Sequence, residues 1–320
     1  MDGLGRRLAI GLGLGLIVVV GLMVYSDMNA LGGVLSSISW APFGWALGLS
    51  LLGYGVRVCK WELYLRRLEI RIPLVPSVLC FVAGMVMSIT PGKVGEVLKS
   101  FLLRSAYGVP VARSAPIVVA ERLTDLMALL LLTSLGVASS GYGWPVLVAG
   151  SSLVVGLLLV FAWGPAGQLV VRLCERLPGL SRVAPRLEEA RAAMQELMGA
   201  RVLVATLVLS IVAWGLEAVG TWLILGGLPG VSSSLGEATF VYAFSTVAGA
   251  LTMLPGGLIA TEGSMLALLE LTTGLAPSGE VATAATLLVR FATLWFGVAL
   301  GALGLWGFHR AVRSSGTTSG

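Results

Sequence analysis

The sequence predicts an all-α polytopic membrane protein, with six full transmembrane helices and two oppositely oriented re-entrant Pro-Gly hairpins that form an inverted repeat. Hydrophobic residues make up 57% of the 320-residue chain, charged residues make up only 12%, and the mean hydropathy is +0.94. Soluble domains carry about a quarter charged residues, so this composition indicates a chain that folds in a bilayer. The 43 glycines suit the close helix packing found in membranes.

Runs of about 20 apolar residues predict the full spans. A signal peptide is an alternative for residues 1–25, but no A-x-A-like cleavage site follows, which favours a retained first span. The whole chain, 1–320, is expected to be one integral membrane domain, with a first half at 1–163 and a second half at 202–308. The six predicted spans are 8–25, 42–58, 114–134, 145–163, 202–225 and 281–308.

Two further apolar stretches, 76–90 and 238–254, each end at a Pro-Gly break. Both are short for a full crossing. The sequence predicts that they form re-entrant hairpins, of which the first (76–104) enters from the cytoplasm and the second (236–270) from the outside. Irregular backbone at membrane depth requires shielding by protein or a water-filled cavity, so a site is expected between the two turns.

The basic residues predict the orientation, because Lys and Arg favour the cytoplasmic side. This rule places both termini, the 164–201 connection and the 309–320 tail in the cytoplasm, and the chain in the cytoplasmic (inner) membrane. Two interpretations of the connection remain open, a basic amphipathic helix on the anionic leaflet and a solvated cytoplasmic helix. The flanking basic residues include Arg6, Arg7, Arg57, Lys60, Arg66, Arg67, Arg71, Arg104, Arg113, Arg201 and Arg310.

Cysteine and histidine usage excludes several function classes. The three cysteines, Cys59, Cys80 and Cys174, form no CxxC motif, and His309 is the single histidine. No disulfide framework, zinc site or Ser-His-Asp constellation can be assembled from this set. We therefore expect no metal, no cofactor, no catalytic residue and no enzymatic activity. The net charge of +5 is attributed to orientation rather than to nucleic-acid binding.

Both predicted hairpins turn at a Pro-Gly break with a threonine nearby. The turn residues are Pro91 and Gly92 in the first hairpin, and Pro255, Gly256 and Gly257 in the second. Since the hairpins enter from opposite sides, the repeated plan predicts two copies of inverted topology. Broken helices that meet near the midplane of an inverted repeat are typical of transporters.

Charged residues repeat along with the turns. Arg122 follows Pro91 by 31 residues, and Arg290 follows Pro255 by 35 residues. Each charge inside the bilayer costs at least about 2.5–3.5 kcal/mol, so the intramembrane charges predict a substrate or ion pathway. The alternative is that they only pair with one another, for example Arg122 with Glu96, and Arg290 with Glu262 or Glu217. The candidate binding residues are Lys93, Glu96, Glu121, Arg122, Asp125, Glu217, Glu262 and Arg290.

Three ordered motifs point to a family. TPGKVGE at 90–96, AERLTD at 120–125 and LPGGL at 254–258, the last followed by Glu262, resemble the lysylphosphatidylglycerol synthase/flippase transmembrane-region family over about residues 10–308. The resemblance implies flipping of lipids with charged or sugar-bearing headgroups between leaflets. No soluble synthase domain is expected after Phe308. The second hairpin departs from the pattern, which has a glycine near Ile259 or Ala260.

The physical pattern and the resemblance together predict translocation of a phospholipid or of a lipid-linked charged or glycosyl headgroup. A proton- or ion-coupled small-solute transporter, a membrane-embedded lipid-modifying enzyme and an accessory subunit remain alternatives. The expected partner is the membrane lipid itself, with no nucleic acid. The sequence leaves open a homo-oligomer and a separate synthase or glycosyltransferase partner.

Overall fold

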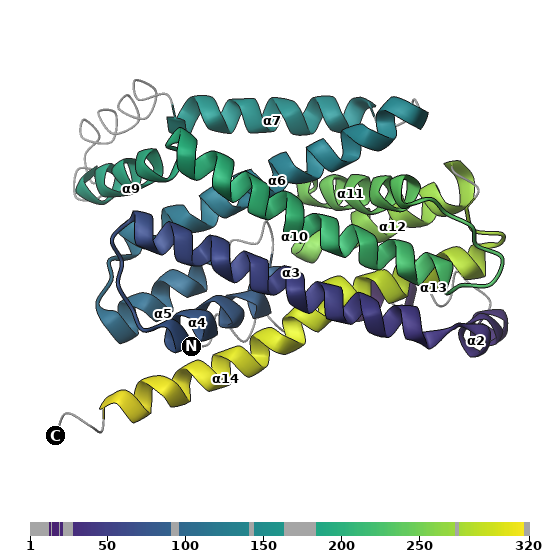
Figure 1. Ribbon diagram of the computed structural model, residues 1–320, viewed down its shortest axis with the longest axis horizontal. Coiled ribbons are helices and arrows are strands. Elements are labelled where there is room, and N and C mark those ends of the chain that lie inside the picture. The colour runs from purple at the N-terminus through teal and green to yellow at the C-terminus, as the bar shows by residue number, and fades with distance from the viewer. Residues whose placement is uncertain are drawn as a thin grey trace.

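The computed structural model describes residues 13, 15–18, 20–21, 28–90, 96–140, 144–162, 184–272 and 275–316. Every regular element in these ranges is helical (Figure 1), in agreement with the predicted all-α class. Most of the predicted first span, 8–25, lies outside the described residues. Pro91, Gly92 and Lys93 of the first turn also lie outside them.

Two long antiparallel helices, α3 (Trp40–Arg67) and α10 (Ala200–Gly226), lie side by side through the middle of the molecule (Figure 1). Small residues bring their backbones together, since a Cβ added to Gly220 would lie 3.4 Å from the Cβ of Ala46. Close approach of this kind replaces the hydrophobic driving force that helices lack in lipid. Both broken helices pack against this pair.

A second layer is formed by α6 (Val111–Ser140) and α7 (Trp144–Ala162), which lie next to each other in Figure 1. The shorter helix α9 (Ala184–Leu197) packs against α6. An ion pair of 2.9 Å between Arg113 and Glu196 joins the two helices. The part of the long connection that the structure describes is therefore packed against the helical bundle.

The first broken helix consists of α4 (Leu74–Met85), the 3-10 turn η1 (Val86–Ile89) and α5 (Leu98–Tyr107). These elements occupy the predicted hairpin region 76–104. The C-cap of α5 is Gly108, whose φ of 70° lies in the left-handed region that glycine enters without steric penalty.

The second broken helix consists of α11 (Leu235–Leu251), the 3-10 turn η3 (Pro255–Gly257), α12 (Ala260–Ala267) and the π-helical turn η4 (Leu268–Thr272). These elements occupy the predicted hairpin region 236–270. In the described residues, each predicted hairpin region thus contains a 3-10 segment between two α-helices.

The backbone of the second turn adopts positive φ angles. Gly256 and Gly257 have φ of 61° and 66°, and Ile259 has φ of 73°. Left-handed backbone is open to glycine but is an outlier for a β-branched residue. A glycine was expected near Ile259 or Ala260, and the structure shows that Ile259 is held at a positive φ.

The last helix runs through α13 (Gly279–Arg290), the π-helical segment η5 (Phe291–Trp295) and α14 (Phe296–Gly316). It contains the predicted span 281–308. Four glycines on one face of this helix contact α4, η1 and Tyr54. A Cβ added to Gly301 would lie 2.3 Å from the backbone N of Val86, so a side chain larger than hydrogen cannot fit there without moving a helix.

Each broken helix packs mainly against the long helix of the other half. The arm α4 packs on α14, the arm α11 packs on α6, and the turn η1 contacts the turn η3. The apolar contact between the turns joins Ile89 to Leu258 and Leu294. Because each broken helix packs on the other half, the two interruptions lie together in the interior of the protein.

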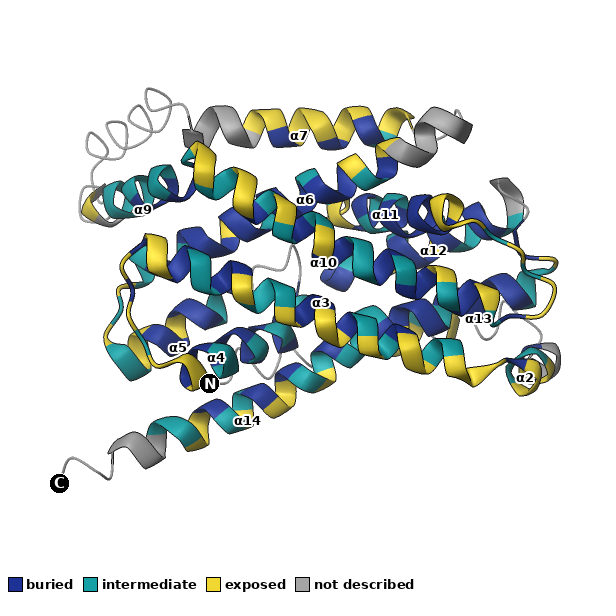
Figure 2. Cartoon of the chain, viewed as in Figure 1, coloured by how far each residue is buried: buried dark blue, intermediate teal, exposed yellow. Residues whose placement is uncertain are grey.

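The described helices include two that are long and apolar enough to cross a membrane, at Ala200–Gly226 and Gly279–Val312. A third candidate is the pair formed by α2 (Met28–Ser37) and α3, which is bent by 84°. Exposed residues occur along the outer helices (Figure 2), and many are large and apolar, such as Val208 and Leu303. The protein is therefore membrane-embedded, while the number of six full spans stays a prediction.

Candidate functional site

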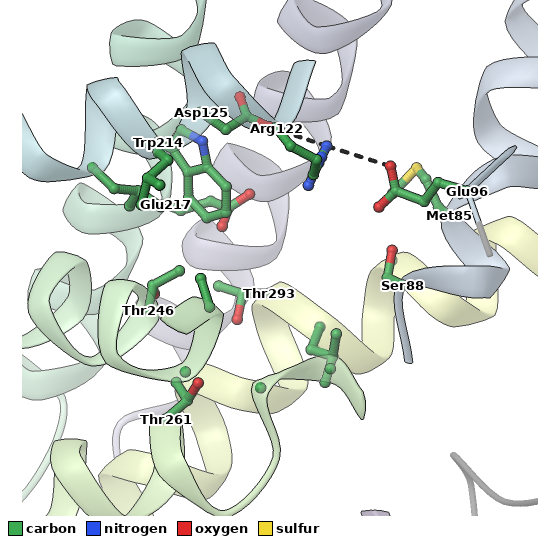
Figure 3. Close-up of a pocket in the computed structure, with 18 of the residues that line it drawn as sticks. Met85, Ser88, Glu96, Arg122, Asp125, Trp214, Glu217, Thr246, Thr261 and Thr293 are labelled. Carbon is green, nitrogen blue, oxygen red and sulfur yellow. Dashed lines mark ion pairs between the residues drawn. The ribbon is translucent and has the colours of Figure 1, made fainter. Parts of the chain in front are cut away.

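A cavity of about 380 Å³ lies where the two broken helices meet α3, α6 and α10 (Figure 3). Both interruptions contribute to it, with Ser88 from η1 and Gly256 from η3. Apolar residues such as Leu126 complete the wall. The charged residues that line it in the described part of the chain are Arg57, Glu96, Lys99, Arg122, Asp125, Glu217 and Arg290.

Arg122, on α6, is the most accessible of these charges. Its guanidinium Nη2 lies 3.0 Å from Asp125 Oδ2 and 3.4 Å from Glu96 Oε2 (Figure 3). The helix places Arg122 and Asp125 three residues apart, on one face. The arginine side chain is 32% exposed although both carboxylates are buried, and its Nε has no hydrogen-bond partner among the described residues. The guanidinium therefore reaches the cavity, although this Nε is itself buried.

Lys99, on α5, links the first broken helix to α6. Its ammonium group donates a hydrogen bond to Glu121 and lies 3.9 Å from Glu96 Oε2. The ring centroid of Trp61 lies 4.9 Å from the same nitrogen, within the range of cation-π attraction. Because the lysine and both carboxylates are buried, this cluster fixes the position of α5 against α6.

Asp125 also pairs with a cation from the opposite direction. Its Oδ1 lies 2.6 Å from Lys60 Nζ on α3 and accepts a hydrogen bond of 3.0 Å from Ser210 on α10. Lys60 in turn donates to Ser210 at 2.8 Å. This buried triangle joins α3, α6 and α10 behind the cavity.

Arg57 and Glu217 form a second pair at the wall of the cavity. Arg57 Nη2 lies 2.7 Å from Glu217 Oε1, and the guanidinium carbon lies 4.2 Å from the ring centroid of Trp214. The other oxygen of Glu217 accepts a hydrogen bond from the Tyr242 hydroxyl. The arginine side chain is 16% exposed, so it reaches the cavity surface while its carboxylate partner is buried.

Arg290 holds the second turn. Its Nε lies 2.5 Å from Glu262 Oε1, and its Nη2 donates a hydrogen bond of 2.8 Å to the carbonyl of Gly256. This carbonyl belongs to a segment without regular helical hydrogen bonding, where an unpaired polar group would cost several kcal/mol in lipid. The arginine replaces the missing helical partner.

The structure brings seven of the eight charged candidates together, and Lys93 lies outside the described residues. Five of the seven line the cavity, while Glu121 and Glu262 pair with the lining residues Lys99 and Arg290. Among the turn residues, Gly256 and Gly257 line the cavity, Pro255 is buried in η3, and Pro91 and Gly92 are not described. Substrate binding by any of them stays a prediction.

Two residues that the sequence assigned to a cytoplasmic flank are instead part of the interior. Arg57 and Lys60 pair with Glu217 and Asp125, and their role in orientation stays a prediction. Lys99 was also absent from the candidates. The missed information was helical periodicity, since α3 continues without interruption to Arg67 and carries both cations on faces that meet other helices.

Metal binding has no support in the part of the chain that the structure describes. No group of three or more His, Cys, Asp or Glu residues that could hold a metal ion occurs there. The clustered carboxylates instead meet Arg and Lys side chains, as in Asp125 with Arg122 and Lys60. The site is therefore an ion-pair network around a cavity.

A bundle of helices with two interrupted members around a buried charged cavity defines the chain as a helical membrane protein. The family model for the lysylphosphatidylglycerol synthase TM region matches residues 10–301, and the chain therefore belongs to that family. This match confirms the family that the three sequence motifs indicated, a membrane family linked to the synthesis and flipping of lipid headgroups. A comparison with curated proteins gives no match.

Proposed function

We propose that the protein translocates a phospholipid or a lipid-linked charged or glycosyl headgroup across the cytoplasmic membrane, as a transporter and not as an enzyme. The observation that carries the proposal is Arg122, an arginine of the helical bundle that is 32% exposed at a cavity of about 380 Å³. An arginine fork suits phosphate, which it binds bidentately. Pockets of about 300–1,000 Å³ hold small ligands, so the cavity accepts a headgroup and leaves the acyl chains outside.

Exposed apolar residues at the rim of the cavity support a lateral opening. Val119 on α6 and Met253 and Leu254 beside η3 line the cavity and are also exposed at the protein surface. In a bilayer such residues face hydrocarbon. We place the acyl chains at this rim, with the headgroup inside against Arg122.

The packing of each broken helix against the long helix of the other half supports an alternating-access mechanism. In this proposal the broken helices are the two re-entrant hairpins of an inverted repeat, and rocking of the halves exposes the cavity to one leaflet and then to the other. The carboxylates Glu96 and Asp125 hold Arg122 when no headgroup is bound. A phosphate would take over part of that hydrogen bonding during transfer.

The remaining parts of the proposal follow the basic residues and the family. Both termini lie in the cytoplasm, and a separate synthase or glycosyltransferase supplies or uses the lipid. A homo-oligomer is compatible with the mechanism, but each chain has its own cavity. Neither a metal nor a cofactor takes part.

The test is a flipping assay in proteoliposomes with acyl-labelled anionic, aminoacylated and polyprenyl-phosphate lipids. Dithionite, which reacts only with label in the outer leaflet, reports the initial rate. We expect Arg122→Ala to lower the rate at least tenfold. The matched control is Arg310→Ala, which removes an arginine that stacks on Trp306 outside the cavity, and which we expect to flip at the unaltered rate.

The proposal fails if the unaltered protein is indistinguishable from empty vesicles with all of these lipids. Proton-linked uptake of a water-soluble substrate without lipid transfer would establish the small-solute transporter instead. Release of a chemically modified lipid would establish an enzyme.

A further inference from the structure

We infer that Lys60 is a positioning residue for the cavity, which does not touch a ligand but holds Asp125 so that Arg122 stays available to an anionic group. The inference rests on the proposed function, because it names a residue that tunes the arginine on which that function depends. Three observations carry it: the place of Lys60 behind the cavity, the complete hydrogen bonding of its ammonium group, and the unequal bonding of the two oxygens of Asp125.

Lys60 lies on α3, behind the wall of the cavity. Its side chain is 2% exposed and does not line the cavity, whereas Asp125 and Arg122 both do. Figure 3 shows Arg122 between Asp125 and Glu96. A ligand in the cavity therefore contacts Arg122 directly, and Asp125 stands between that arginine and Lys60.

The ammonium group of Lys60 has three hydrogen-bond donors, and each of them has an acceptor. Nζ donates to Asp125 Oδ1 at 2.6 Å, to the Ser210 hydroxyl at 2.8 Å and to the Thr124 hydroxyl at 3.5 Å. Ser210 also donates to the same oxygen of Asp125, at 3.0 Å. Because α3, α6 and α10 all contribute to this set, three helices fix the position of Asp125 Oδ1.

The second oxygen of Asp125 is bound less completely. Oδ2 is buried and lies 3.0 Å from Arg122 Nη2 in an ion pair. The pair does not have the geometry of a hydrogen bond, so Oδ2 has no hydrogen-bond partner within the described ranges. Asp125 thus attracts Arg122 without an aligned hydrogen bond, and the arginine side chain stays 32% exposed.

Two cations share the single negative charge of Asp125. Lys60 is the closer of the two, and Coulomb attraction rises as the distance falls. Without Lys60, Arg122 would be the remaining ion-pair partner of Asp125 in the described part of the chain. The carboxylate could then turn toward Arg122 and form the charge-assisted hydrogen bonds that are now missing. Arg122 would be held more tightly and would bind a phosphate less well.

Chemical modification of Arg122 tests the inference without transport. Phenylglyoxal reacts with guanidinium groups that are accessible and weakly paired, and mass spectrometry reports the rate at each arginine. We expect Lys60→Met to slow the modification of Arg122 about 2- to 10-fold, as one added hydrogen bond implies. The double variant Lys60→Met/Asp125→Asn, which also removes the carboxylate, should restore the rate. The matched control is Arg113→Met, because Arg113 pairs with Glu196 at 2.9 Å on the same helix and does not line the cavity.

Flipping kinetics separate positioning from a purely structural role. The initial rate is measured with labelled phosphatidylglycerol at increasing mole fraction. We expect Lys60→Met to raise the half-saturating mole fraction about 2- to 10-fold, and Lys60→Met/Asp125→Asn to return it to the value of the unaltered protein. A purely structural role would lower the maximal rate, through loss of folded protein, and leave the half-saturating fraction unchanged. Arg113→Met should also leave this fraction unchanged.

The outcomes distinguish the inference from the proposed function. An unchanged modification rate in Lys60→Met, or a slower rate that Lys60→Met/Asp125→Asn does not reverse, would overturn the inference. If Lys60→Met does not fold, Asp125→Asn alone is the test, since Arg122 should then react at least as fast as in the unaltered protein, and a slower reaction would overturn the inference. A slower rate that the double variant reverses, in a protein that flips no lipid, would overturn the proposed function and keep the inference.

Discussion

Arg122 and Arg290 occupy corresponding places after the two turns, but their surroundings differ. Arg290 is 11% exposed and binds Glu262 and the Gly256 carbonyl at 2.5 and 2.8 Å. Arg122 is 32% exposed and lies 3.0 and 3.4 Å from its two carboxylates. Arg290 thus holds a turn in place, and Arg122 faces the cavity.

The partners of the two arginines differ as much as their exposure. Without Arg122, Asp125 would still have Lys60 at 2.6 Å, and Glu96 would have Lys99 at 3.9 Å. Without Arg290, no other cation within the described residues pairs with Glu262. Arg122 can therefore move away from its carboxylates at a low cost in free energy, as a ligand-binding group must. Arg290 cannot.

The largest effect on stability is expected from Arg290→Ala. It leaves a buried carboxylate and a buried turn carbonyl unpaired, and removing one partner of a buried ion pair costs about 3–5 kcal/mol. The measurement is the free energy of unfolding in SDS or by steric trapping. The double variant Arg290→Ala/Glu262→Ala should recover part of the loss; a single variant as stable as Arg310→Ala would remove the difference between the two arginines.

The second-largest loss of stability is expected from a steric change at the contact between α14 and the first broken helix. Gly301→Leu inserts a side chain where a Cβ alone already comes within 2.3 Å of the Val86 nitrogen. Overpacking of this kind costs about 1–3 kcal/mol. Gly55→Leu is the control, since nothing lies within 4 Å of a Cβ at Gly55. Equal unfolding free energies for the two variants would mean that α14 does not hold α4 as described.

A stabilising change is expected in the second turn. Ile259→Gly should relieve the strain of an isoleucine at φ 73°, and strained backbone of this type costs about 1–3 kcal/mol. Loss of chain rigidity in the unfolded state offsets part of the gain, so we expect a net increase of about 1 kcal/mol in the unfolding free energy. Unfolding of Ile259→Gly beside Ile259→Ala measures it, because alanine cannot relieve a positive φ. A less stable glycine variant would contradict the assigned strain.

The smallest stability effect is expected from Arg122→Ala, at no more than about 1 kcal/mol, since partly exposed pairs contribute little and both carboxylates keep other cations. The same variant should still lower the flipping rate at least tenfold. Arg122→Lys, which keeps the charge but not the planar fork, should recover part of the rate. A loss of stability as large as that of Arg290→Ala would show that both arginines have a structural role.

Much of the fold could be predicted from sequence, because interruptions in apolar runs are local features. The Pro-Gly break at Pro255 and the long helices were predicted, and the pairs of Arg122 with Glu96 and of Arg290 with Glu262 were named as the alternative to a substrate pathway. The second turn was recognised even though Ile259 replaces an expected glycine. Residues within one broken helix and the span that follows it are separated by few residues, and their spacing was sufficient.

The unpredicted part of the site involves partners far apart in sequence. Arg57 pairs with Glu217, and Lys60 pairs with Asp125, because α3 packs against α10 and α6 at the positions of these two cations. A hydropathy window ends an apolar span at the first cation and cannot register that the helix continues through it. The packing of helices, rather than the composition of either segment, decides whether such a cation is buried.

The glycine face of α14 has a consequence for synthesis. The arm α4 leaves the ribosome roughly 200 residues before Gly301. At a synthesis rate of 5–20 residues per second, about 10–40 s pass before α14, the helix against which α4 chiefly packs, is available. At 12 residues α4 is also too short to span the bilayer alone. The first broken helix is therefore synthesised early, but its packing against α14 forms last. A chain that stops before α14 would leave α4 without its main packing partner, and we expect cellular quality control to recognise such a chain.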